Sequence, residues 1–128
     1  MNDELLAPAD LERGREIRRR VLGENHVEQS YAVDALSRPK TQLSEYVWSK
    51  IWARPGLSLK ARSIANLAML TALNRPRELK LHVNAALNNG LTKEEISEVL
   101  LQTGVYCGLP AAEESFRIMR EAFAERAG

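Results

Sequence analysis

The stretch from Leu59 to Leu73 constrains the fold more than any other part of the chain. Its residues are good helix formers with apolar side chains nearly all round, and Ser58 before it is a natural helix cap. An amphipathic surface helix buries one face, whereas a helix that is apolar on most sides must be covered on most sides. We therefore expect other helices, together with a partner subunit, to pack around residues 59–73.

The remaining chain is divided into helical segments by its few glycine and proline residues. The 7 glycines and 5 prolines fall between stretches rich in Ala, Leu, Glu, Arg and Lys, and no segment alternates apolar and polar residues as a half-buried strand does. Helices are predicted at residues 9–22, 39–53, 59–73, from Pro76 to an end at Gly90, at 93–106 and at 110–125, with a further short segment at 27–36. The fold class is therefore all-α, with six or seven helices.

Several helix ends carry their own signals. Ser37 and Ser58 are expected to cap the helices that follow them, and Thr92 with Glu95 forms a T-x-x-E capping box. Gly23 and Gly108 are expected to end the helices that precede them.

Composition limits the functions that such a chain can have. With 128 residues, 45% of them hydrophobic and 27% charged, we expect a single globular domain over residues 1–128. A net charge of +1 gives no general attraction to nucleic acid or to acidic membranes. The single cysteine excludes an intrachain disulfide and any C-x-x-C site. No signal peptide and no membrane-spanning stretch is recognisable, so a cytoplasmic protein is expected.

Glu78 and His82 are the first candidates for chemistry. They stand four residues apart on one predicted helix and so share a face. A carboxylate next to an imidazole is a common arrangement for proton transfer, although an exposed pair without a function has the same spacing. His26 is the only other histidine, so no metal site is expected.

Other residues have both a functional and a purely structural interpretation. Trp52 and Arg54 stand at a predicted helix end, where the arginine either binds a carboxylate or is simply solvated. Arg62 is the only charge in the long apolar stretch that follows Lys60, and it either lines a cleft or extends to water. Cys107, without a dedicated histidine and acid, is expected to be a small buried residue and not a nucleophile.

Longer strings of sequence resemble one family. The strings VLGENHV, YVWSKIWARPGL and ANLAMLTALNRPRELKLHVNAALNNGLTKEEISEVLLQTGVYCGLPAA are similar to the γ-carboxymuconolactone decarboxylases, over residues 12–122. The resemblance implies the alkyl hydroperoxidase D-like helical fold and a homo-oligomer, usually a hexamer. It also implies loss of CO2 from a carboxylated butenolide to give 3-oxoadipate enol-lactone, in the protocatechuate branch (the β-ketoadipate pathway) of aromatic hydrocarbon catabolism.

The peroxidase branch of the same superfamily uses a C-x-x-C-x-x-x-H motif. When that motif is placed on His82, its two cysteines fall at Arg75 and Glu78. Since neither residue is a cysteine, peroxide reduction through a disulfide is excluded by residue type.

The implied reaction needs no cofactor, because the unsaturated lactone accepts the electron pair that the departing carboxylate leaves. The protein has to orient carboxylates, stabilise charge on the lactone and deliver a proton to carbon. We expect His82 to donate the proton and Glu78 to orient it. The expected substrate contacts are Arg54, Arg62, Trp52, Tyr106 and His26.

The chain departs from the family pattern at two positions. Gln29 and Asn84 stand where these decarboxylases commonly have arginine. A neutral side chain does not supply the same charge-assisted hydrogen bonds to a dicarboxylic substrate. Two alternatives therefore stay open: an enzyme of the same fold that moves a proton on another small lactone or cyclic enol without CO2 loss, and a non-catalytic helical assembly protein.

Overall fold

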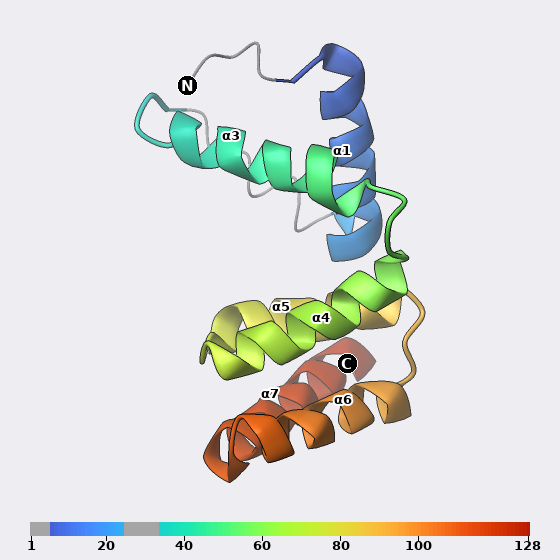
Figure 1. The fold of residues 1–128 in the computed structure, drawn as a ribbon, viewed down its shortest axis with the longest axis vertical. Coiled ribbons are helices and arrows are strands. Elements are labelled where there is room, and N and C mark those ends of the chain that lie inside the picture. The colour runs from blue at the N-terminus through green and yellow to red at the C-terminus, as the bar shows by residue number, and fades with distance from the viewer. Residues whose placement is uncertain (1–5, 25–33) are drawn as a thin grey trace. The chain divides into compact units, whose positions relative to one another are not determined.

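The computed structural model describes residues 6–24 and 34–128, and these residues form helices and turns without a strand (Figure 1). The α-helices are α1 (Pro8–Leu22), α3 (Arg38–Tyr46), α4 (Leu59–Ala72), α5 (Pro76–Asn88), α6 (Lys93–Tyr106) and α7 (Leu109–Ala127), with a π-helical segment, η2 (Val47–Trp52). The predicted all-α class is confirmed. Within the described ranges, no helix is both long enough and apolar enough to cross a membrane.

The chain forms two compact units, residues 1–57 (unit 1) and residues 58–128 (unit 2). The first contains α1, α3 and η2, and the second contains α4 to α7. That residues 1–128 behave as a single domain stays a prediction.

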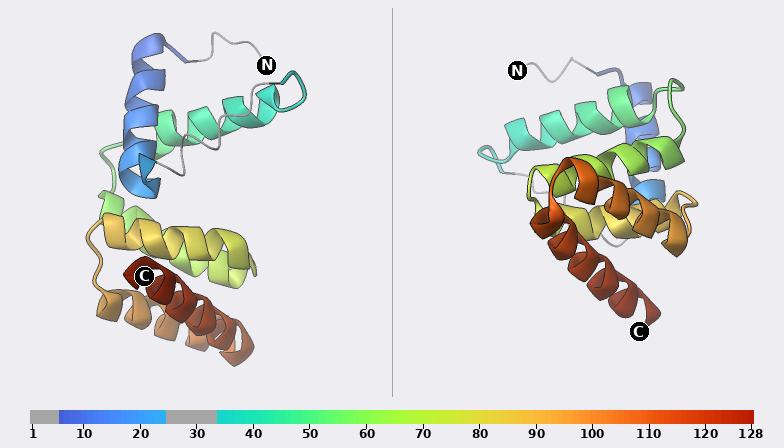
Figure 2. Two further views of the ribbon diagram at one scale, coloured as in Figure 1. Left: turned by 180° about the vertical axis from the view of Figure 1, so that it is seen from behind. Right: turned by 60° about the horizontal axis from the view of Figure 1, so that its bottom comes forward.

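Unit 2 is built around its own hydrophobic core. Helix α4 packs against α5 and α6, and α7 packs against α5 and α6 (Figure 2). Because every one of the four helices contributes apolar side chains at helical spacing, the unit encloses a continuous buried cluster. Its fully or almost fully buried members are Leu67, Leu79, Val83, Ala86, Leu91, Ile96, Leu100, Ile118, Met119 and Ala122.

The predicted helix caps of unit 2 are present. The Ser58 hydroxyl accepts a hydrogen bond from the backbone N–H of Ala61 at 3.0 Å. The Thr92 hydroxyl accepts from the Glu95 N–H at 3.0 Å, and the Glu95 carboxylate accepts from the Thr92 N–H at 2.9 Å, which completes the capping box. Gly108 has φ 99°, a left-handed conformation that ends α6 at low cost for glycine.

Helix α4 is the segment predicted to need cover on most sides. Within unit 2 it buries Ser63, Leu67 and Thr71 against its neighbours. Three large apolar side chains of residues 59–73 remain exposed: Ile64 at 40%, Met69 at 52% and Leu73 at 62%. The packing by other helices is confirmed, and cover by a partner subunit stays a prediction.

Unit 1 is held together where α1 crosses η2, and α3 also lies against both. The Trp48 and Trp52 rings stack with centroids 5.0 Å apart, and both side chains are buried. Gly14 allows the close approach of α1, since a Cβ at this position would lie 2.2 Å from the Ser49 hydroxyl oxygen and 2.9 Å from its backbone nitrogen.

Two local predictions for unit 1 are wrong. Residues 39–53 were expected to be α-helical throughout, but residues 47–52 are π-helical, and the Ala53 N–H bonds to the Trp48 carbonyl at 3.1 Å. Ser37 stands at the N-cap position of α3, but its side chain makes no cap hydrogen bond, and the Asp34 carboxylate accepts from the Ser37 N–H at 2.7 Å. Most of the predicted segment at 27–36 lies outside the described residues.

Candidate functional site

The α4–α5 hairpin of unit 2 positions the candidate site. Asn74 adopts φ 57°, which asparagine tolerates better than most residues, and Pro76 starts α5 immediately afterwards. The chain therefore turns back sharply, and α5 runs beside α4. Leu79, Val83 and Ala86 of α5 are buried at helical spacing, which leaves the neighbouring His82 at the edge of the core, half-buried.

His82 faces an amide of the opposite helix. Its Nδ1 lies 3.4 Å from Nδ2 of Asn66 on α4, a long hydrogen bond. Asn89, the C-cap of α5, is seven residues after His82, and it donates to two residues that precede Asn66 in α4, the Leu59 carbonyl at 3.4 Å and the Ser63 hydroxyl at 2.8 Å. These contacts lie in the same antiparallel register, so the pairing of His82 with Asn66 follows from the packing of the whole hairpin.

Arg62 places a cation on the same face of α4. It stands one turn before Asn66, at the spacing that brings side chains onto one face. Its side chain is half-buried, as expected for an apolar stem lying on the protein. An imidazole, an amide and a guanidinium group are thereby carried by two packed helices of unit 2.

Glu78 lies on α5 one turn before His82 and is exposed. The hydrogen-bond partner of the His82 Nδ1 is Asn66, which lies on the opposite helix α4. The orienting role expected of Glu78 stays a prediction. Asn66 was not among the residues predicted from the sequence, although an amide four residues after Arg62 on a largely apolar helix was a signal.

The far side of α5 is tied to α7. The Lys80 ammonium group donates to the carboxylates of Glu125 at 2.5 Å and Glu121 at 2.9 Å. These hydrogen bonds, the one to Glu125 first, raise the pKa of Lys80. Because residues two apart point to different sides of a helix, this contact holds α5 in place without occupying the face of His82.

Asn84 also lies away from His82 in the same helix. It is half-buried, and its amide donates to the Lys80 carbonyl one turn earlier at 3.3 Å. The arginine that the family commonly has here would therefore not add a cation to the His82 face of the same unit.

The other predicted residues lie in different places. Tyr106 ends α6 with 81% of its surface exposed. Trp52 and Arg54 belong to unit 1, the first buried against Trp48 and the second exposed. His26 and Gln29 lie outside the described residues. The predicted contacts of these residues with substrate stay predictions. Cys107 is exposed, so its predicted burial is wrong.

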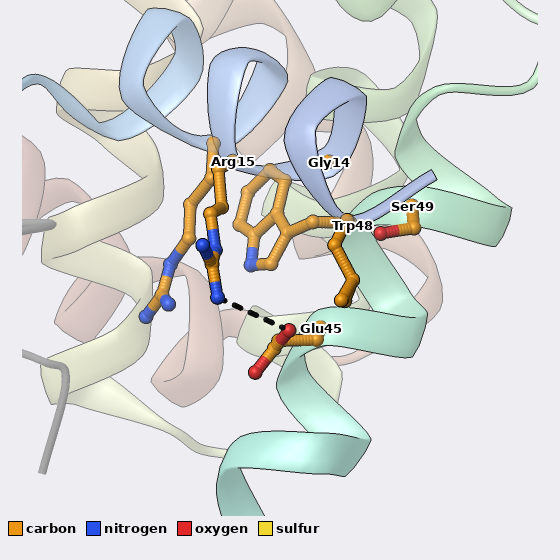
Figure 3. Close-up of a pocket in the computed structure, with 7 residues that line it drawn as sticks. Gly14, Arg15, Glu45, Trp48 and Ser49 are labelled. Carbon is orange, nitrogen blue, oxygen red and sulfur yellow. Dashed lines mark ion pairs between the residues drawn. The ribbon is translucent and has the colours of Figure 1, made fainter. Parts of the chain in front are cut away.

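A small pocket is present in unit 1. Arg15, Glu45, Trp48 and Ser49 are among the residues that line it (Figure 3), and Arg15 forms an ion pair with Glu45 at 3.7 Å. The enclosed space is about 10 Å³, close to the room that one water molecule needs. This pocket by itself is too small for a lactone. No cluster of metal-ligating side chains is found within residues 6–24 and 34–128.

Similarity to known proteins covers the same helices. The model of the Carboxymuconolactone decarboxylase family matches residues 40–121, which include α4, α5 and all predicted site residues except His26. The chain belongs to this family. It is 38% identical to the 4-carboxymuconolactone decarboxylase of Acinetobacter baylyi, over 96% of this chain and 90% of that protein.

A second relative in the family has another substrate in its name. The chain is 36% identical to the nitrosuccinic acid decarboxylase of Metarhizium robertsii, over 94% of this chain and 85% of that protein. Family membership and the two named decarboxylases identify the chain as a carboxy-lyase, and the idea of a non-catalytic assembly protein is dropped.

Proposed function

We propose that this carboxy-lyase removes CO2 from 4-carboxymuconolactone and forms 3-oxoadipate enol-lactone in the protocatechuate branch of aromatic degradation. The 38% identity to a decarboxylase of that name over nearly the full length supports this substrate. The observation that carries the chemistry is the half-buried imidazole of His82, held beside Asn66 on the face of the hairpin that also carries Arg62.

The reaction divides between the substrate and the protein. The bond between the ring carbon and the carboxylate breaks, CO2 leaves, and the electron pair enters the unsaturated lactone as a dienolate. His82 then donates a proton to carbon and is reprotonated from water. No cofactor is required for the electron pair, because the substrate delocalises it.

Arg62 is the proposed carboxylate-binding residue of unit 2. A guanidinium group forms two parallel hydrogen bonds with a carboxylate, and partial burial strengthens them. Such a contact fixes the plane of the substrate relative to His82. We propose Glu78 as a second acid near His82, and Trp52, Arg54, Tyr106 and His26 as further substrate contacts.

Assembly is part of the proposal. The exposed apolar side chains of α4 and the 81% exposed Tyr106 support a homo-oligomer in which neighbouring subunits cover these surfaces. We expect a hexamer located in the cytoplasm, and light scattering of the purified protein measures the number of subunits.

A second substrate class is favoured by one observation. The relative from Metarhizium robertsii is named for nitrosuccinic acid, and a nitro group stabilises a carbanion on its own carbon much as an unsaturated lactone does. The shared requirement is a dicarboxylic acid that contains its own electron acceptor. Nitrosuccinic acid is therefore the second candidate substrate, after 4-carboxymuconolactone.

The test is an assay of the purified protein with each acid in D2O. With 4-carboxymuconolactone we expect CO2 release, an ultraviolet change of the ring and one deuterium bound to carbon in the product. Deuterium exchange without CO2 release would instead support proton transfer as the reaction. CO2 release from nitrosuccinic acid alone would replace the lactone as substrate.

A further inference from the structure

We infer that Asn66 positions His82, by holding its Nδ1 so that Nε2 is the nitrogen that exchanges a proton with the substrate. This inference rests on the proposed role of His82. It starts from the contact of 3.4 Å between Asn66 Nδ2 and His82 Nδ1, which joins two helices across 16 residues of sequence.

The surroundings of Asn66 single it out. It is half-buried in the middle of α4, between Ala65 and the fully buried Leu67. Asparagine is among the less favourable residues in a helix interior, because its amide competes with the backbone for hydrogen bonds. A half-buried amide in an apolar helix that faces an imidazole is therefore best explained by that contact.

In a neutral imidazole, the hydrogen bond made by one ring nitrogen determines whether the other ring nitrogen carries the proton. When the Asn66 amide donates to Nδ1, the proton of the neutral ring resides on Nε2. When the ring is protonated, the amide can turn and accept from Nδ1–H with its oxygen. Asn66 thus serves both protonation states, whereas a carboxylate at this position would favour only the form with a proton on Nδ1.

Asn66→Asp is the decisive variant, because it keeps the shape and exchanges the amide for an anion. We expect the His82 pKa to rise by about one unit or more, and the neutral ring to carry its proton on Nδ1. Nitrogen-15 NMR of the imidazole measures both without any substrate. The chain has only two histidines, so the spectrum of His82→Gln assigns the signals.

Asn88→Asp is the matched control. This residue is exposed on α5, where it accepts a hydrogen bond from Arg126, and six residues of helix separate it from His82 by about 9 Å. It introduces the same charge change and should leave the tautomer and the pKa of His82 as in the wild type. Equal spectra for Asn66→Asp and Asn88→Asp would overturn the inference.

Kinetics give an independent result. The rate should fall as pH rises through the His82 pKa, and in Asn66→Asp this decline should move to higher pH together with the NMR titration. Asn66→Leu should lower kcat about tenfold with little change in KM. Absence of lactone turnover would count against the proposed function and leave the NMR test intact. Turnover with an unmoved pH profile in Asn66→Asp would overturn the inference alone.

Discussion

Unit 1 and unit 2 differ in how they are held together. Unit 2 has a core to which four helices contribute, with fully buried Leu67, Val83 and Ile96. In unit 1, the described residues bury Gly14, Val21, Trp48, Ser49 and Trp52, around one stacked aromatic pair. A catalytic side chain must be kept in place within a fraction of an ångström, and a packed helix does this best. The comparison favours unit 2 as the source of the proton donor.

The two units also differ in backbone geometry. Unit 2 is regular, with a complete capping box at the start of α6. Unit 1 changes from α-helix to π-helix at Val47, and the π-helical segment contains the two stacked tryptophans. Regular helices with strong caps are easily recognised in sequence, whereas the π-helical segment depends on how its side chains pack.

The largest expected effect comes from His82. We expect His82→Gln to lower kcat for decarboxylation about 100-fold or more, since a glutamine keeps a polar group but donates no proton to carbon. The measurement is CO2 release under saturating substrate. Asn88→Gln, at an exposed position of the same helix, should keep near-normal turnover. A kcat for His82→Gln within a few-fold of the wild-type value would exclude His82 as the proton donor.

Gly14→Ala tests how tightly unit 1 depends on its helix crossing. The added Cβ meets the Ser49 side chain at 2.2 Å and the Ser49 backbone nitrogen at 2.9 Å, so α1 and η2 must separate. We expect a loss of about 1–3 kcal/mol in stability. Amide hydrogen exchange should accelerate in α1 and η2, with α4 to α7 unchanged.

The control for this substitution lies in unit 2. A Cβ at Gly104 would lie at an ordinary 3.4 Å from the Cβ of Ala112, so Gly104→Ala should be neutral or stabilising. If Gly14→Ala accelerated amide hydrogen exchange equally in both units, the expectation that the substitution destabilises unit 1 alone would be refuted.

Arg62→Lys tests the substrate side of unit 2. Lysine keeps the charge and loses the paired hydrogen bonds, so we expect KM to rise about tenfold with a smaller change in kcat. Arg77→Lys, at an exposed position of α5, is the control. Steady-state kinetics with the dicarboxylic substrate measure both, and an unchanged KM in Arg62→Lys would exclude Arg62 from carboxylate binding.

A comparison of helix caps contrasts the units directly. Thr92→Ala removes a hydrogen bond to the Glu95 N–H and should cost about 1 kcal/mol in stability, whereas Ser37→Ala removes a side chain that makes no cap. Thermal unfolding should therefore show a lower Tm for Thr92→Ala and almost no change for Ser37→Ala. Equal decreases in Tm for the two variants would contradict this difference between Thr92 and Ser37.

The smallest expected effect depends on pH. The hydrogen bond from the Thr92 backbone, followed by the Lys60 side chain, lowers the pKa of Glu95. A carboxyl group with a lowered pKa in the folded state stabilises above its unfolded pKa, and this contribution is lost as pH falls through the folded value. Chemical denaturation should therefore give Glu95→Gln a lower free energy of unfolding than the wild type at neutral pH, and the difference should disappear in acid. A difference that persists in acid would contradict this assignment.

Local signals were enough for most of the helices. Ser58, the Thr92 and Glu95 pair, Pro76 and Gly108 act within one turn of the chain, so their effect does not depend on the rest of the fold. The same holds for the all-α class. His82 and Arg62 were also selected by residue type and short spacing, and their roles stay proposals.

Contacts between distant segments were not available to such reasoning. Asn66 became a candidate only through a partner on another helix, and the side chain of Ser37 does not make the cap hydrogen bond expected of it. The π-helical turn at Val47 likewise goes with the stacking of two tryptophans and the close approach of Gly14. Residue identity and short spacing set where helices begin and end, because those energies are local. The partner of each polar side chain was decided by packing, because it depends on the register between helices that the order of residues does not specify.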